Sequence, residues 1–385
     1  MNTKKLYELD SFQQSFDAKV IACEKVDGFY QVQLDETCFF PESGGQSGDR
    51  GWLNDQEVLD TQIRNSQILH IMRQEHGIGE TVHGQIDFER RFDLMQHHSG
   101  EHIFSGLAFS RYGAVNVGFH LSDQSVTLDL DQELSQDDLM ALEQEVNQVI
   151  WQNYPISTAI YENEELDELN YRSKKALDGQ VRLVTVEKVD CCACCAPHVN
   201  RTGQVGAFVI QSVEKYKGGI RLSILCGKRA IAEHHKLLAQ SSMLCKVFSA
   251  KPDQLADLAE GLQNDLLMLK RKYDDLQLDY AMQKIDTSNQ PFILYVAEAM
   301  EAVTAKRLLQ TILEKNYKMA MLLIGTENED YRFYAATREI DLKILLEQLK
   351  TSFEAKGGGN KEMIQGSIRV SKEQMSEFLQ KIVNA

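Results

Sequence analysis

The sequence has 385 residues, of which 43% are hydrophobic and 25% are charged, and its formal net charge at pH 7 is -16. This length exceeds the usual size of one hydrophobic core, so two or three domains of ordinary globular composition are expected. The negative charge argues against broad, nonspecific attraction to nucleic acid, because phosphate binding draws on lysine and arginine. No apolar run reaches membrane-spanning length, and no apolar core follows Lys4 and Lys5, so a cytoplasmic protein is expected.

Residues 1–86 are predicted to form a small antiparallel β domain that resembles a barrel. Short alternating stretches with turn residues between them support this prediction. They are 18–23, 29–34, 51–53, 67–71 and 81–86. Cys38–Gly51 is a glycine-dense loop whose backbone can approach a ligand, although its composition alone indicates a structural hairpin.

Residues 87–231 are predicted to form an α+β domain around a helix. Asp93 with Gln96 resembles a capping box at the start of this helix, and Gly113 indicates its end. His98 and His102 would then point from one face of the helix, where two imidazoles can hold one metal ion. Gly100 costs a helix about 1 kcal/mol relative to alanine, which is easier to understand if something approaches the backbone there.

A cysteine cluster follows nearly a hundred residues later, directly after a predicted strand at 182–186. It comprises Cys191, Cys192, Cys194 and Cys195, with His198 close behind. In a long cytosolic chain such clusters more often bind metal or do redox work than form disulfides. Buried reduced thiols and an exposed redox pair are alternatives, but His198 favours metal. Cys194 and His198, combined with the two helix histidines, would offer sulfur and nitrogen ligands suited to zinc.

The rest of this region supplies further elements, and the chain then becomes helical. Strands are predicted at 114–121, 125–130, 208–210 and 220–227, and a helix at 136–152. In the helical region 232–287, leucines at 255, 262, 269 and 276 give residues 252–282 a continuous apolar seam. This seam packs either on Leu237, Leu238, Leu244 and Val247 as a hairpin or on a second copy as a homodimer.

Residues 288–385 alternate strand and helix, which predicts an α/β domain. The predicted strands are 292–296, 319–324 and 331–336, with helices at 305–315 and from 372. Lys356–Ser367 is a glycine-rich loop. It could cradle a phosphate through its backbone amides or serve as a flexible connector.

Four motifs, in this order, resemble the editing region of alanyl-tRNA synthetase. They are Phe40–Gly51, His98-x-x-x-His102, Cys194-x-x-x-His198 with Thr202-Gly203 after it, and Gly219–Gly227. No aminoacylation domain precedes them, so the chain resembles a free-standing alanyl-tRNA editing protein of the longer type. The family commonly has Cys-Gly-Gly-Thr-His where this chain has Cys194-Cys195-Ala196-Pro197-His198. The tail around 357–366 resembles the C-terminal domain of the same synthetase.

The resemblance implies a zinc-dependent esterase that acts in trans on mischarged tRNA(Ala), removing serine or glycine. It assigns His98, His102, Cys194 and His198 as zinc ligands. The candidate catalytic residues are Glu101, as a base or a positioning group, Asn116, which would recognise the serine hydroxyl, and Gln46 of the glycine-rich motif. Candidate basic patches for RNA are Arg90-Arg91, Lys174-Lys175, Lys215 with Lys217 and Arg221, and Lys270-Arg271-Lys272.

Two other functions fit parts of the same pattern. His98-Ser99-Gly100-Glu101-His102 satisfies the inverted zinc peptidase motif, which needs a carboxylate ligand on a later helix and has no use for Cys194. A structural zinc in an RNA-binding adaptor would be closed by two cysteines and two histidines, for example Cys191 and Cys194 with His98 and His102. An exchangeable water on the metal would exclude this closed site.

Overall fold

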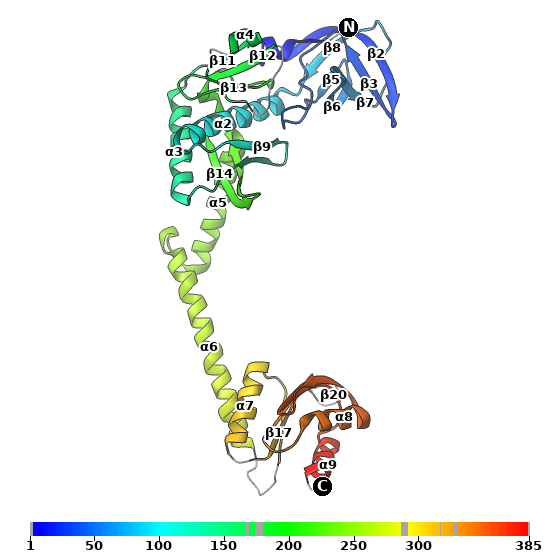
Figure 1. The fold of residues 1–385 in the computed structure, drawn as a ribbon, viewed down its shortest axis with the longest axis vertical. Coiled ribbons are helices and arrows are strands. Elements are labelled where there is room, and N and C mark those ends of the chain that lie inside the picture. Colours follow the sequence, from blue (N-terminus) through cyan, green and yellow to red (C-terminus); the bar gives the residue numbers. More distant parts are fainter. Residues whose placement is uncertain are drawn as a thin grey trace. The chain divides into compact units, whose positions relative to one another are not determined.

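The structure is a computed structural model that describes residues 3–166, 169–173, 180–285, 292–315, 317–326 and 330–383. It divides into two compact units, residues 1–242 and 243–385. The mixed α+β class with several sheets is confirmed (Figure 1), whereas the predicted domain boundaries near 86, 231 and 287 stay predictions. Among the described residues, none of the helices is both long enough and apolar enough to span a membrane.

In the first unit, six strands close into an antiparallel barrel. Around the barrel they run β2 (Ser15–Val26), β3 (Phe29–Leu34), β7 (Gln67–Met72), β6 (Gln56–Arg64), β5 (Gly51–Leu53) and β8 (Thr81–Ile86). The sequence prediction missed β6, because its polar residues Asp60, Thr61 and Gln62 interrupt the apolar alternation. The short elements β1 (Lys4–Lys5), α1 (Leu6–Leu9) and β4 (Glu36–Thr37) lie beside the barrel.

His70 lies fully buried inside the barrel as a neutral imidazole. Its Nδ1 donates to the carbonyl oxygen of Val32, and its Nε2 lies 2.9 Å from the hydroxyl oxygen of Thr37. Burial disfavours the charged ring and lowers the pKa of His70 to about 4, although the bond to Val32 acts in the opposite direction.

We therefore expect the free energy of unfolding to fall as the pH drops from 6.5 to 4. In this window the unfolded chain binds a proton at His70 that the folded chain does not, which removes about 3 kcal/mol of stability. Urea unfolding across this range, compared between the wild type and His70→Gln, measures the contribution. The glutamine variant should show a weaker pH dependence, and equal slopes would contradict the assignment.

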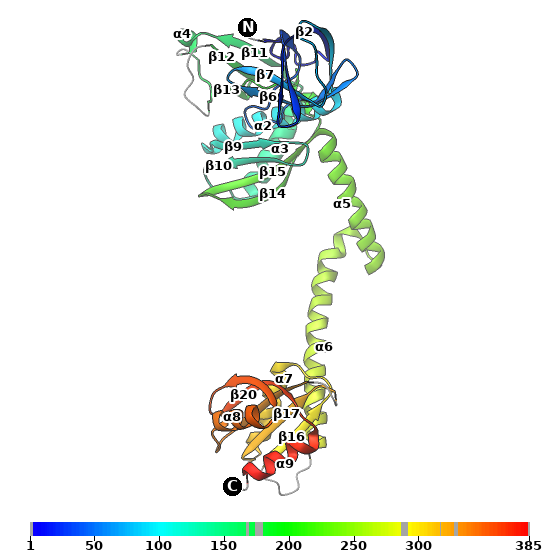
Figure 2. The same ribbon diagram turned by 90° about the vertical axis from the view of Figure 1, so that its right-hand side faces the viewer.

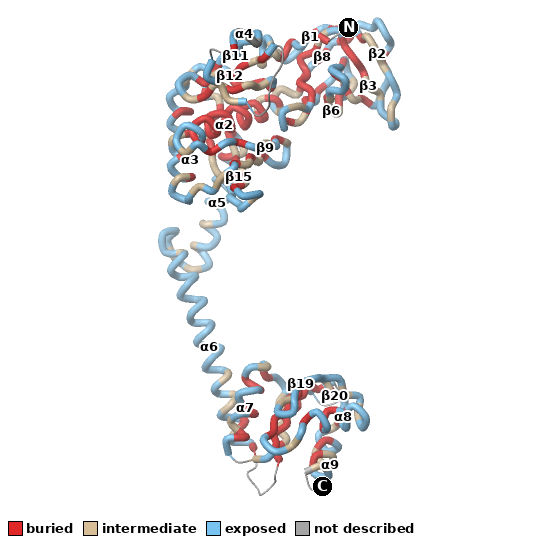
Figure 3. The backbone as a smooth tube through the Cα atoms, in the orientation of Figure 1, coloured by how far each residue is buried: buried red, intermediate tan, exposed pale blue. Residues whose placement is uncertain are grey.

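Helix α2 (Phe88–Tyr112) is the central element of the first unit and is buried over most of its length (Figure 3). It begins earlier than predicted, because the side chain of Asp87 accepts a hydrogen bond from the Arg90 amide and acts as the cap. The prediction of Asp93 as the cap was wrong. Asp93 lies inside the helix, and its Oδ2 pairs with Arg229 Nη2 at 2.5 Å. The predicted end is confirmed, because Gly113 has a φ of 68° in the left-handed region.

Two sheets and a second helix surround α2. A four-stranded sheet has the order β14 (Phe208–Tyr216), β15 (Gly219–Cys226), β10 (Val126–Leu130) and β9 (Asn116–Leu121) (Figure 2). The other sheet comprises β11 (Ile156–Tyr161), β12 (Val181–Val186) and β13 (Asp190–Ala193). The predicted helix is confirmed as α3 (Gln136–Gln152), and the short elements are α4 (Asn163–Leu166) and η1 (Thr202–Val205). β13 therefore contains the first part of the cysteine cluster.

Two long helices follow, α5 (Gly227–Phe248) and, after η2 (Pro252–Gln254), α6 (Leu255–Lys284). The heptad leucines Leu262, Leu269 and Leu276 are 59%, 64% and 65% exposed. The homodimer through 252–282 and the alternative hairpin both stay predictions. The C-terminal end of α6 belongs to a core in which Ala281 and Ile285 pack with residues of α7 (Ala302–Glu314).

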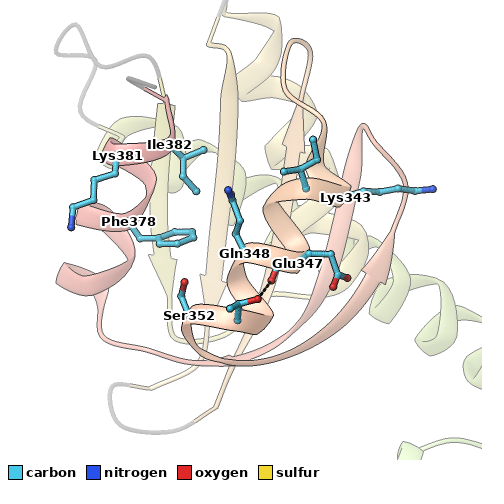
Figure 4. Close-up of a pocket in the computed structure, with 9 residues that line it drawn as sticks. Lys343, Glu347, Gln348, Ser352, Phe378, Lys381 and Ile382 are labelled. Carbon is cyan, nitrogen blue, oxygen red and sulfur yellow. Dashed lines mark hydrogen bonds between the residues drawn. The ribbon is translucent and has the colours of Figure 1, made fainter.

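The second unit is built on a five-stranded sheet. Its order is β16 (Phe292–Ala297), β17 (Met319–Ile324), β18 (Tyr331–Thr337), β20 (Met363–Arg369) and β19 (Glu354–Gly359), with only the first pair parallel. One core of this unit includes α7, and the other includes α8 (Leu342–Ser352) and α9 (Lys372–Val383). A groove of about 660 Å³ lies between α8 and α9, with the Phe378 ring along it (Figure 4).

The prediction of a loop at 356–367 was wrong. These residues form most of the β19–β20 hairpin, in which Lys356 pairs with Ser367 and Gly358 pairs with Gln365. Because β19 is the edge strand of its sheet, only the backbone groups that face β20 are committed to the ladder, and phosphate binding by the others stays a prediction. Glycines that were interpreted as a loop signal therefore lie within strands.

Candidate metal centre

Four predicted ligand side chains from two distant segments meet in one cluster. His98 and His102 project from α2, whereas Cys194 and His198 come from the loop that follows β13. Each contributes a ligand atom, and these atoms all lie within 4.8 Å of one another. All three histidines are buried at 3% exposure. The structure thus brings together two segments that are nearly a hundred residues apart.

The spacing of these atoms suits a zinc ion. Cys194 Sγ lies 3.6 Å from His98 Nε2 and 3.4 Å from His198 Nε2. Sulfur and nitrogen ligands at about 2.3 and 2.1 Å from one tetrahedral zinc would be roughly 3.6 Å apart. Burial alone would raise the pKa of the Cys194 thiol, but the neighbouring imidazoles hold it well below its usual range. That favours the thiolate, which is the form that binds metal.

Each ligand imidazole has a polar partner at its other nitrogen. His98 Nδ1 lies 2.7 Å from Gln46 Oε1, and His198 Nδ1 lies 3.0 Å from Ser99 Oγ. His102 Nδ1 lies 3.4 Å from Asp190 Oδ2, which is an ion-pair distance without hydrogen-bond geometry. Partners of this kind fix the orientation and tautomer of metal-binding histidines. A cluster with this arrangement of partners could hold a metal ion.

Asp190 in turn is held by Arg172. The guanidinium donates from Nε at 2.7 Å and from Nη2 at 2.8 Å to the two carboxylate oxygens. Burial would raise the pKa of Asp190, but His102 and Arg172 lower it below its usual value. A charged carboxylate is thus kept behind His102. No sequence motif marks Arg172, which reaches Asp190 only through the fold.

We expect Asp190→Asn to weaken zinc binding by about 10- to 100-fold, because the amide is a poorer partner for the His102 ring. Competition with a chromogenic chelator measures the affinity. Asp129→Asn is the matched control, since it breaks a similar two-pronged pair with Arg221 in the four-stranded sheet. Equal zinc affinity in the wild type and Asp190→Asn would contradict this role.

His97, the residue before the His98-x-x-x-His102 motif, has a structural function. Its Nδ1 donates to the carbonyl oxygen of Asp93, and its Nε2 accepts the backbone N–H of Cys226. Burial lowers the pKa of His97 to about 4, so the ring is neutral. The same strand end explains Gly100, because a Cβ there would lie 2.5 Å from Cys226 Sγ. The close approach expected from the sequence is therefore that of the Cys226 thiol.

A second polar network adjoins the ligands. Glu101 Oε1 accepts hydrogen bonds from the Ser105 hydroxyl at 2.6 Å and from the Asn116 side-chain amide. Its other oxygen lies 4.0 Å from His102 Nε2. The side-chain oxygen Oδ1 of Asn116 accepts a hydrogen bond from the backbone N–H of Gly118. Two of the candidate catalytic residues thus lie beside the candidate metal ligands, and their roles stay predictions.

The glycine-rich loop lies against β9 beside the cluster. Leu121 donates its backbone N–H to Gly45 O at 2.7 Å and accepts from Ser47 at 3.0 Å. Gly45 has a φ of 86°, and a Cβ there would collide with the carbonyl oxygen of Phe119. Ser43 Oγ lies 3.7 Å from Cys195 Sγ. The loop therefore reaches from β9 to the cysteine segment, and it carries Gln46, the third candidate catalytic residue.

Two neighbouring cysteines of the cluster lie on opposite faces of strand β13. Cys192 groups with His102 and Asp190, whereas Cys191 lies on the opposite face of β13, where Thr185 donates to its thiol.

The prediction of a basic RNA-binding patch at Arg90-Arg91 was wrong, because Arg91 is fully buried and paired with Asp49. Lys174-Lys175 lies outside the described residues.

Three family models match parts of the chain. The second additional domain of threonyl and alanyl tRNA synthetases matches residues 181–222, class II (A) tRNA synthetases match 3–90, and the DHHA1 domain matches 289–385. The first of these matches begins at β12 and covers the segment with Cys194 and His198. Two of the three models therefore describe parts of tRNA synthetases.

Similar proteins extend the comparison to nearly the whole chain. The alanyl-tRNA editing protein AlaX-L of Pyrococcus horikoshii is 26% identical over 97% of this chain and 96% of its own. The alanyl-tRNA editing protein Aarsd1 of Rattus norvegicus is 29% identical over 73% of each chain. An alanine–tRNA ligase of Saccharolobus islandicus is 29% identical over 69% of this chain and 31% of the ligase. The resemblance to free-standing alanyl-tRNA editing proteins is confirmed.

Proposed function

We propose that this protein is a cytoplasmic trans-editing hydrolase that deacylates mischarged tRNA(Ala), with Ser-tRNA(Ala) as its main substrate and Gly-tRNA(Ala) as a second. The observation that carries the proposal is the cluster of His98, His102, Cys194 and His198, whose histidines are buried, with the Glu101 carboxylate beside it. The similarity to alanyl-tRNA editing proteins supports the substrate class.

The side chains of the cluster would bind zinc. A zinc ion held there would supply a Lewis acid for the ester carbonyl and lower the pKa of a bound water. Glu101 is the carboxylate placed to accept a proton from the attacking water. Ser105 and Asn116 hold one of its oxygens, so that the other faces His102. The ribose hydroxyl of the substrate that does not carry the amino acid is the alternative proton acceptor. In that case Glu101 acts as a positioning residue.

One observation favours a second candidate, the structural-zinc adaptor. Four protein ligands fill a tetrahedral site, which is the usual arrangement of a structural zinc, whereas catalytic zinc keeps a position open. If zinc were held by all four side chains, hydrolysis would need a further position for the water or the substrate. Exchange of a metal-bound water, measured by nuclear relaxation with Co²⁺ in place of zinc, separates the two functions.

The inverted-motif metallopeptidase is less well supported. It needs a carboxylate ligand on a later helix, but the carboxylate that groups with His102 is Asp190 on strand β13. It also gives no role to Cys194 and His198, which lie among the other ligand atoms.

Deacylation assays test the proposed function. Purified protein is incubated with Ser-tRNA(Ala), Gly-tRNA(Ala) and Ala-tRNA(Ala), and the release of each amino acid is followed. We expect serine to be released fastest and Ala-tRNA(Ala) to persist. His98→Ala, which removes one ligand, should release none of them above the uncatalysed rate. Failure of the zinc-loaded wild type to release serine or glycine would overturn the proposal.

A further inference from the structure

Gln46 has a buried side-chain amide that lacks a partner for its donors. The residue is 0% exposed, and its Oε1 lies 2.7 Å from His98 Nδ1. Its Nε2 is also buried, and it has no hydrogen-bond partner among the described residues. A buried donor without a partner is rare and unfavourable, so this one calls for a specific explanation.

The orientation of the amide follows from its neighbour. His98 directs Nε2 to Cys194 Sγ, so the proton of a neutral ligand imidazole lies on Nδ1. A nitrogen that donates must face the amide oxygen, which leaves the NH₂ group of Gln46 pointing elsewhere. Because the two polar atoms of one amide are about 2.3 Å apart, this donor lies within about 5 Å of His98 Nδ1.

The backbone of Gln46 is fixed as well. It exchanges two hydrogen bonds with Ser43, and the residues on either side of it are bonded to Leu121 of β9. The amide of Asn116 differs, because it donates to Glu101 and its oxygen accepts from Gly118. Of these two amides near the cluster, Gln46 is therefore the one with donors left for a ligand.

We propose that Gln46 is a specificity residue whose Nε2 donates a hydrogen bond to the side-chain hydroxyl of the serine that is removed. This inference rests on the proposed function. The hydroxyl would satisfy the buried donor, whereas alanine and glycine have no hydroxyl and leave it unpaired. A site built for a hydroxyl discriminates in this way against substrates that lack one.

The test compares two substrates within one variant. Gln46→Met removes both the acceptor for His98 and the free donor, so any effect on the metal changes both substrates together. We expect kcat/KM for Ser-tRNA(Ala), relative to Gly-tRNA(Ala), to fall by about 10- to 100-fold. Ala-tRNA(Ala) is the reference if glycine release is too slow to measure. If the variant kept the wild-type ratio of the two kcat/KM values, even with both values lowered, the inference would be overturned.

Two further variants keep the test decisive. Gln46→Asn serves if the methionine variant does not fold. It retains an amide, but its side chain is too short to reach both His98 and the substrate hydroxyl, so the ratio of the two kcat/KM values should also fall. Asn116→Ala, run beside it, should alter both rates without a comparable change in their ratio. If only Asn116→Ala lowered kcat/KM for Ser-tRNA(Ala) relative to Gly-tRNA(Ala), Asn116 rather than Gln46 would recognise the serine hydroxyl. A wild type that releases neither amino acid refutes the proposed function, whereas one that releases glycine but not serine refutes only this inference.

Discussion

Cys194→Ala is expected to release the zinc and to lower Ser-tRNA(Ala) deacylation by at least about a thousandfold, because the Lewis acid is worth several kcal/mol to the transition state. Cys194 supplies the one sulfur of the cluster, and its Sγ lies 3.4 to 3.6 Å from two ligand nitrogens. Metal content and kcat/KM are measured on the same preparation, so that the two losses can be compared.

Cys195→Ala is the matched control for this variant. Its thiol is next in the chain but does not belong to the group of four ligand atoms. We expect it to retain both the metal and the activity. If Cys194→Ala retained both zinc and hydrolytic activity, the Cys194 thiolate would not be a ligand. The metallopeptidase hypothesis would then gain support.

Arg91→Met is expected to lower the free energy of unfolding of the first unit by about 3 to 5 kcal/mol, the cost of leaving a buried charge without its partner. Arg91 and Asp49 are 0% and 1% exposed. Arg91 binds both oxygens of Asp49 and also donates to Cys38 O. The pair joins α2 to the glycine-rich loop, so its loss should also disturb Gln46. Urea unfolding followed by circular dichroism gives the value.

The double variant Arg91→Met with Asp49→Leu should be more stable than the sum of the two single changes predicts, because no unpaired charge is left. Arg90→Ala provides the control on the neighbouring residue. Arg90 is 11% exposed, pairs with the 39% exposed Asp123 and donates to Gly48 O, so its loss should cost less than that of the fully buried Arg91 pair. A loss in Arg91→Met no larger than that of Arg90→Ala would contradict the role of the buried pair.

Local spacing explains the part of the site that the sequence could predict. Two histidines four residues apart on a helix, and a cysteine and a histidine four residues apart in a cluster, are short-range patterns with a direct geometric meaning. The same holds for Gly113, whose left-handed φ of 68° ends α2. The start of α2 was misplaced because Asp93 and Gln96 imitate a cap, although Asp87 supplies it.

Long-range partners were beyond the sequence. Arg172 approaches Asp190, Arg91 approaches Asp49, and Gln46 approaches His98 across 18, 42 and 52 residues, and no periodicity marks such pairs. The hairpin at 354–369 was missed for another reason, because its glycines weaken the strand signal while the pairing itself forms in three dimensions.

X-ray absorption at the zinc edge of the purified protein tests the central claim most directly. The arrangement of His98, His102, Cys194 and His198 predicts one sulfur at about 2.3 Å and three nitrogens at about 2.0 to 2.1 Å. Two or more sulfur neighbours, or a protein that binds no zinc, would contradict it.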